Sequence, residues 1–125
     1  MDRERQELKN RYSTLSEEVL FSEKGIKGLY GAAKRWIEEG KKQGDTNKLE
    51  NAYRFLSDAK EIQGKYVGKV IVPKEELTNL QKAALSEAYK ILQEKEKNSN
   101  FISRYFISRK RGKIREQLKE LGERK

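Results

Sequence analysis

The sequence predicts an all-α fold, a small bundle of four to five helices with a protruding basic C-terminal helix and one short extended connector. Apolar residues recur at helical spacing along most of the chain, and polar or glycine-rich turns separate these stretches. Only one short run is rich in β-branched residues, and it has no partner strand elsewhere. With 125 residues, the chain is expected to form a single domain.

The first part of the chain divides into an N-terminal helical arm at residues 1–13 and a helical bundle at residues 14–97. A capping box at Thr14 and Glu17 predicts the start of a new helix. Gly44 is placed to end the following glycine-rich helix, and residues 45–47 offer caps for the next one. Apolar stripes with helical spacing run along both helices, and they contain Ile26, Leu29, Ala33, Trp36, Leu49, Ala52, Tyr53, Leu56 and Ala59.

The segment "KYVGKVIVP" follows Gly64, which is expected to end the preceding helix. It favours an extended connector, and residues 69–72 are a candidate strand for pairing between subunits. Pro73 suits the first turn of another helix, and "NSN" at residues 98–100 is expected to cap a last, basic helix at residues 101–125. The side chains expected to be buried include Trp36, Leu56, Leu77 and Ile91.

Charge is concentrated at the C-terminal end of the sequence. The chain has 29 Lys and Arg against 20 Asp and Glu, a net charge of +9. Residues 101–125 hold nine of these cations and three Glu, a net +6, so residues 1–100 carry +3. A small basic protein typically meets nucleic acid, an anionic membrane or an acidic partner, and this asymmetry marks the C-terminal fifth as the contact region.

The segment "FISRYFISRKRGK", residues 101–113, combines aromatic and aliphatic residues with cations. We interpret the cations as phosphate-binding, and the alternatives are a solvated helix end or a membrane surface. The Phe and Ile residues are expected to dock the segment on the bundle or on a second subunit, with base stacking as the alternative. The candidate nucleic-acid-binding residues of the last helix are Arg104, Arg109, Lys110, Arg111, Lys113 and Arg115.

A second basic feature lies on the polar side of the glycine-rich helix. Two rows of cations recur there at seven-residue spacing, about 10 Å apart, which can follow a phosphate groove. Gly25, Gly28 and Gly31 leave the helix edge bare enough for another backbone to approach. An exposed, solvated face is the equally weighted alternative. The candidate residues are Lys27, Lys34, Lys41, Arg35 and Lys42.

Enzyme chemistry has little support in this sequence. There is no Cys and no His, which excludes thiol nucleophiles, imidazole acid–base catalysis and Cys/His zinc sites. The Asp58-x-Lys60 spacing of some nucleases falls on a predicted helix. We therefore expect no catalysis, metal site, cofactor or small-molecule substrate. We also expect no membrane span and no secretory signal, and a location in a virion or in the cytoplasm or nucleoid.

These observations favour a structural protein that binds nucleic acid through its phosphates, largely without sequence preference, with double-stranded DNA favoured over RNA. In "FISRYFISRKRGK" and "GIKGLYGAAKRW" the chain resembles the nucleocapsid (major coat) proteins of filamentous archaeal viruses. That resemblance implies paired subunits wrapping linear double-stranded DNA in a virion. A chromatin-like cellular role fits equally, and a homo- or hetero-oligomer of similar subunits is expected. The alternative is a helical protein–protein interaction module, an adaptor or regulator, without nucleic acid.

Overall fold

The computed structural model describes residues 3–123, which are helical for most of their length and contain no β-strand. The all-α prediction is confirmed, with six α-helices in this range where the sequence indicated four or five. Residues 1–2 of the predicted arm and 124–125 of the predicted last helix lie outside it. In chain order the elements are α1 (Arg3–Arg11), α2 (Glu17–Leu20), α3 (Glu23–Gln43), α4 (Thr46–Glu61), the π-helix η1 (Ile62–Val67), α5 (Lys74–Lys97) and α6 (Phe101–Glu123).

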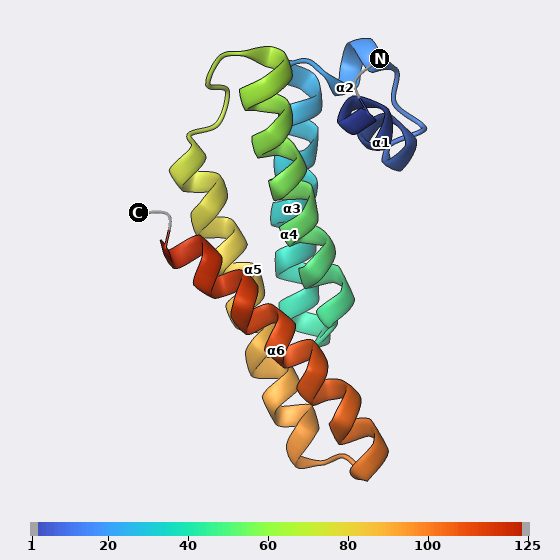
Figure 1. Ribbon diagram of the computed structural model, residues 1–125, viewed down its shortest axis with the longest axis vertical. Helices are drawn as coiled ribbons and strands as arrows, with labels where there is room; N and C mark the ends of the chain where they lie inside the picture. Colours follow the sequence, from blue (N-terminus) through green and yellow to red (C-terminus); the bar gives the residue numbers. More distant parts are fainter. Residues whose placement is uncertain (1–2, 124–125) are drawn as a thin grey trace.

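The long helices pack in the order in which they follow one another (Figure 1). Helices α3 and α4 form an antiparallel pair, α5 packs on α4, and α6 returns along α5. The end of the α5–α6 hairpin extends beyond the α3–α4 turn, and α1 and α2 lie at the opposite end of the molecule. Each of the four long helices therefore packs mainly on the long helix before or after it in the chain.

The α3–α4 turn has the local signals that the sequence predicted. Gly44 adopts the left-handed conformation, with a φ of 64°, and its N–H donates to the carbonyl oxygen of Gly40. The side chain of Asp45 then accepts hydrogen bonds from the backbone N–H groups of Asn47 and Lys48, at 3.0 and 3.2 Å. Both predicted features are confirmed, and together they satisfy backbone groups that the two helix ends leave open.

A single hydrophobic core lies between the helices. Leu56 and Leu77 are fully buried, as predicted, whereas Trp36 and Ile91 are half-buried at its edge. Trp36 packs on the ring of Phe55, with ring centroids 5.1 Å apart. The buried side chains come from every α-helix and include Leu8, Leu20, Ile26, Ala33, Leu49, Leu56, Leu77, Leu85, Ile114 and Leu121.

The N-terminal part of the chain is anchored on α4 by a buried carboxylate. Arg11 contacts Asp58 at 2.7 Å, and the hydroxyl of Tyr12 donates a hydrogen bond to the same carboxylate. Burial, together with this bond, raises the pKa of Tyr12 well above its usual value. The capping box predicted at Thr14 is wrong, because Ser16 caps α2 by accepting from the N–H of Val19 at 3.3 Å.

The predicted end of the fourth helix at Gly64 is also wrong. The helix continues as η1 and ends at Gly68, whose φ is 74°, so only residues 68–73 form the connector. Buried Gln63 holds this connector: its Oε1 accepts from the N–H groups of Ile71 and Val72, and its Nε2 donates to the carbonyl of Val72. These backbone groups are satisfied within the chain, which argues against residues 69–72 as a strand shared between subunits.

Two glycines of α3 provide a matched test of the packing. A side chain at Gly25 would collide with the backbone carbonyl of Leu20, whereas one at Gly31 would meet no atom within 4 Å. We expect Gly25→Ala to reduce the free energy of unfolding by about 3 kcal/mol through overpacking. Gly31→Ala should raise it by about 0.5–1 kcal/mol, since alanine is the better helix former.

Urea unfolding followed by circular dichroism at 222 nm would measure both glycine variants. Equal effects of the two substitutions would contradict the close approach of the α2–α3 turn to Gly25.

Candidate nucleic-acid interface

Three of the six candidate cations on α6 are used to hold that helix against its neighbours. Lys110 reaches α4, where its Nζ lies 3.1 Å from a carboxylate oxygen of Glu50 and 3.2 Å from Oδ1 of Asn47. Arg111 contacts Glu96 of α5 at 3.0 Å. On the next turn, Arg115 donates a 2.6 Å hydrogen bond to the hydroxyl of Tyr89. These three side chains therefore have partners inside the protein.

The Arg111–Glu96 contact is an ion pair without a well-directed hydrogen bond. The Nη2–Oε2 distance is 3.0 Å, yet Glu96 Oε2 and Arg111 Nε lack a hydrogen-bond partner among the described residues. Each side chain is 23% exposed, so water screens the pair only in part. The guanidinium of Arg111 also lies 5.6 Å from the ring centroid of Tyr89.

The other three candidates on α6 are exposed to solvent. Arg104 makes one long contact, 3.4 Å from its Nη2 to the carbonyl oxygen of Ser99. Arg109 and Lys113 form no ion pair or hydrogen bond with a residue that the structure describes. Since they are four residues apart, Arg109 and Lys113 occupy the same side of the helix, and buried Ile114 marks another. We call Arg109 and Lys113 the α6 cation face; Arg104, five residues before Arg109, lies on a different side of the helix.

The candidates on α3 divide in a similar way. Lys27 pairs with Glu23 at 2.9 Å, and Lys34 lies 5.1 Å from the ring centroid of Tyr30. The hydroxyl of Tyr30 donates to Glu76 at 2.6 Å, so acidic groups lie beside this row. The remaining candidates are exposed and form no ion pair with a described residue; they are Arg35, Lys41 and Lys42, and we call them the α3 cation face.

The two cation faces lie on helices with different main neighbours, since α3 packs mainly on α4 and α6 mainly on α5. In Figure 1, α6 lies in front of α5, whereas α3 lies behind α4. Gly28 and Gly31 are exposed on α3, but Gly25 is already occupied by the approach of the α2–α3 turn. The protein therefore carries two separate sets of unpaired cations on two different helices.

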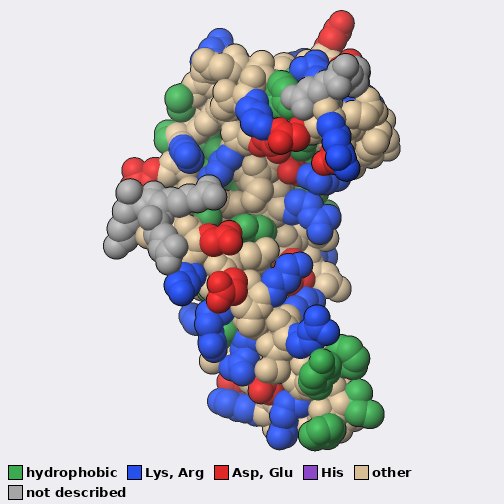
Figure 2. Space-filling model, in the orientation of Figure 1, with side chains coloured by type: hydrophobic (Ala, Val, Ile, Leu, Met, Phe, Trp, Pro, Cys, Tyr) green, Lys and Arg blue, Asp and Glu red, His purple; other side chains and the backbone are tan. Residues whose placement is uncertain are grey.

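The aromatic residues at the start of α6 do not dock on the rest of the protein, so the predicted docking on the bundle is wrong. Of the five large apolar side chains in residues 101–107, only Ile107 is half-buried. The other four side chains form the green group at the lower end of Figure 2, and we call them the tip cluster. Its members are Phe101, 87% exposed, Ile102, 68%, Tyr105, 58%, and Phe106, 63%. Contact with another molecule is the remaining interpretation.

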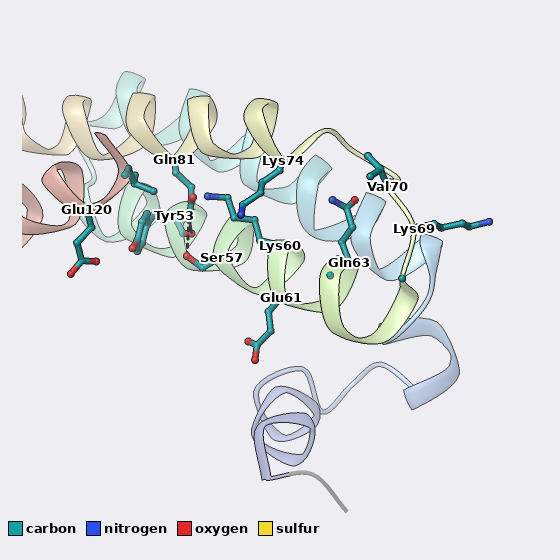
Figure 3. Close-up of a pocket in the computed structure, with 13 residues that line it drawn as sticks. Tyr53, Ser57, Lys60, Glu61, Gln63, Lys69, Val70, Lys74, Gln81 and Glu120 are labelled. Carbon is teal, nitrogen blue, oxygen red and sulfur yellow. Dashed lines mark hydrogen bonds between the residues drawn. The ribbon is translucent and has the colours of Figure 1, made fainter. Parts of the chain in front are cut away.

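A cavity lies between α4 and α5, and residues of η1, of the connector and of the end of α6 complete its wall (Figure 3). It has a volume of about 580 Å³, and Lys60 and Lys74 direct their ammonium groups toward each other there, whereas Glu61 and Glu120 point away. Gln81 behind them is buried and donates to Ser57 Oγ at 2.7 Å and to the carbonyl of Tyr53 at 3.1 Å. Gln81 thus connects α5 to α4.

The described residues contain no group of three or more His, Cys, Asp or Glu that could hold a metal ion. Asp58 of the Asp58-x-Lys60 spacing is buried and bound by Arg11 and Tyr12. Ser57, in the wall of the cavity, has no imidazole to activate it, because the sequence contains no histidine. Within residues 3–123, no helix is long and apolar enough to cross a bilayer.

Comparison with known proteins adds no relative: no family model, curated protein or solved structure matches this chain. The function is therefore inferred from the distribution of charge and apolar surface described above. The partners that sequence reasoning missed are Glu50, Glu96 and Tyr89. The sequence did contain a signal for Glu96 and Tyr89, because a hairpin turn at residues 98–100 places α6 beside α5.

Removing Arg111 should destabilise the protein, whereas removing Arg109 should not. Arg111→Ala leaves the half-buried carboxylate of Glu96 without its cation, and we expect a loss of about 1–2 kcal/mol in the free energy of unfolding. This is below the cost of breaking a fully buried pair because water reaches both groups. Arg109→Ala is the matched control, with an expected change within about 0.5 kcal/mol. Chemical unfolding measures both, and an equal effect would show that the Glu96 contact does not hold α6.

The Arg115–Tyr89 hydrogen bond should be visible in the titration of Tyr89. The bond from Arg115 lowers the pKa of Tyr89, because the guanidinium stabilises the ionised ring. Arg115→Ala should return that pKa to about 10. Because the shift favours the ionised form, its contribution to stability is confined to alkaline pH and disappears as the pH falls below the lowered pKa.

Carbon-13 NMR of the tyrosine ring measures this titration residue by residue. Tyr30 serves as the internal control, since its bond to Glu76 raises its pKa and should be unaffected by the substitution. A Tyr89 titration that is identical with and without Arg115 would contradict the contact.

Proposed function

We propose that this protein binds nucleic acid as a structural protein, through the phosphate backbone and without sequence readout, and that it coats or packages double-stranded DNA. The observation that carries the proposal is the exposed pair Arg109 and Lys113. They share one side of a helix, they have no acidic partner among the described residues, and Arg104 precedes them on the same helix. Cations that the protein leaves unpaired are available to neutralise phosphates.

The paired cations support this role indirectly. Lys110, Arg111 and Arg115 fix the rotation of α6, so the α6 cation face is presented on a rigid helix and not on a loop. In this proposal the helices form a small bundle in which α6 is the basic, phosphate-facing helix. Binding then costs little conformational entropy, because the side chains project from a backbone that is already ordered.

The α3 cation face supports packaging over simple binding. Arg35 and Lys42 are exposed on α3, which packs mainly on α4, whereas α6 packs mainly on α5. One protein could then contact two duplex segments, or two turns of one wrapped duplex. Assembly of several copies on the DNA, in a virion or a nucleoid, belongs to the same proposal. Such assembly is also what the resemblance to nucleocapsid proteins implies.

Salt dependence tests the proposal directly. Each phosphate contact with B-form DNA contributes about −0.9 to the slope of log affinity against log salt. We expect Arg109→Ala with Lys113→Ala to make the slope shallower by about 2, to a similar extent for unrelated DNA sequences. Fluorescence anisotropy of a labelled duplex over a series of salt concentrations gives the slope.

The matched control removes the same charge elsewhere, with Lys90→Ala and Lys95→Ala on α5. Both lysines are exposed, and neither forms an ion pair with a described residue. This control should change the slope by less than half as much. If the two double variants behave alike, the α6 cation face is not the site, and the same test moves to Arg35 and Lys42.

A second candidate function is a helical protein–protein module, and the exposed tip cluster is the observation that favours it. Purification in low salt distinguishes the two candidate functions. Nucleic acid that copurifies raises the absorbance at 260 nm relative to 280 nm and supports the first. Absence of DNA binding in the anisotropy experiment would leave the second.

A further inference from the structure

The tip cluster is a continuous apolar surface on one side of the first two turns of α6. Its members stand at positions i, i+1, i+4 and i+5 of the helix, which places them side by side. The rings of Tyr105 and Phe106 are in edge contact, with centroids 5.5 Å apart. Exposed large apolar side chains that gather in this way mark contact sites for a protein, a ligand or a membrane.

The tip cluster cannot be buried by a small rotation of α6. The opposite side of that helix supplies Ile114 and Leu121 to the core, and both are buried. Turning the helix would expose these side chains and break the contacts of Lys110 with Glu50 and of Arg111 with Glu96. The tip cluster therefore stays in water unless another body covers it.

Cations continue the same side of the helix behind the tip cluster. With a rise of about 1.5 Å per residue, Arg109 lies roughly 6 Å and Lys113 roughly 12 Å further along the axis than Tyr105. Two acids at the end of α5 are already paired, Glu94 with Lys97 at 3.6 Å and Glu96 with Arg111 at 3.0 Å. An apolar end is thus followed by a cationic band.

This order of groups matches an anionic lipid surface. Apolar side chains of interfacial helices reach about 5–10 Å into the boundary between headgroups and acyl chains, and Lys and Arg remain at the level of the phosphates. A tyrosine with an apolar ring and a polar hydroxyl is typical of that boundary. We propose that the tip cluster docks the protein on anionic lipid bilayers, with Arg109 and Lys113 binding the headgroup phosphates.

Two other occupants fit less well. A second copy docked tip to tip would bring two cationic bands close together, and like charges oppose that contact. A DNA base step takes up an apolar wedge, whereas this surface presents four adjoining side chains on the outside of a helix. The lipid proposal shares Arg109 and Lys113 with the proposed DNA contact, but it rests on the tip cluster, and its test contains no nucleic acid.

Vesicle flotation with the full chain tests the proposal. The protein should float with vesicles of phosphatidylglycerol and much less with vesicles of phosphatidylcholine. Phe101→Ser with Phe106→Ser should lower the partition coefficient on phosphatidylglycerol about a hundredfold, since burying each ring contributes about tenfold or more. Arg109→Ala with Lys113→Ala should lower it roughly fivefold for each cation.

Val70→Ser is the matched control. Val70 is 73% exposed, and the connector that carries it lies at the opposite end of the molecule from the α5–α6 turn. This variant should bind phosphatidylglycerol like the wild type. Phe106→Trp adds a direct reporter: its emission should shift to the blue and be quenched by brominated phosphatidylglycerol, after subtraction of the signal from half-buried Trp36.

The proposal is overturned if the protein stays unbound on phosphatidylglycerol, or if the two serine substitutions leave flotation unchanged. Sedimentation that shows a dimer dispersed by the same substitutions, without flotation, would assign the tip cluster to a second copy. A loss of duplex affinity in the serine variant, again without flotation, would assign it to DNA. Circular dichroism of each variant verifies that these surface changes leave the helices intact.

Discussion

The contacts of Lys110 with Glu50 and of Arg111 with Glu96 fix the rotation of α6, and that rotation decides which side chains of the helix face solvent. They turn one side of the helix toward α4 and α5, where Ile114 and Leu121 complete the core. Everything on the other side then faces solvent, including the tip cluster and the α6 cation face. The run of basic residues in this segment is thus divided, because Arg109 and Lys113 face solvent whereas Lys110 and Arg111 have partners on α4 and α5.

The features that sequence could predict are those determined within a few residues. Gly44 and Asp45 end one helix and start the next through contacts with their immediate neighbours. The all-α class follows from apolar spacing in the same local way. Thr14 failed as a cap because the chain makes a turn first and Ser16 takes that position.

The residue types of the candidate site could be predicted from the sequence. Which of its cations have partners could not, because the partners lie far away in the chain. Lys110 and Glu50 are sixty positions apart, and no local pattern joins them. The role of Gln63 could not be predicted either: its side-chain amide accepts the backbone hydrogen bonds of Ile71 and Val72 that a neighbouring strand would otherwise accept. The exposure of Phe101 and Phe106 could not be predicted either, because aromatic residues in a helix are most often core.

The division of the cations between partly shielded and exposed positions has a consequence for reversibility. Salt screens exposed charges most strongly and buried pairs much less. Arg111 and Glu96 are 23% exposed, whereas Arg109 and Lys113 are exposed outright. Rising ionic strength would therefore strip a polyanion from the protein before it loosened the helix that carries the binding groups. In the proposed function, DNA would then be released and bound again without refolding of the protein, so that loading and unloading become a single equilibrium governed by ion concentration.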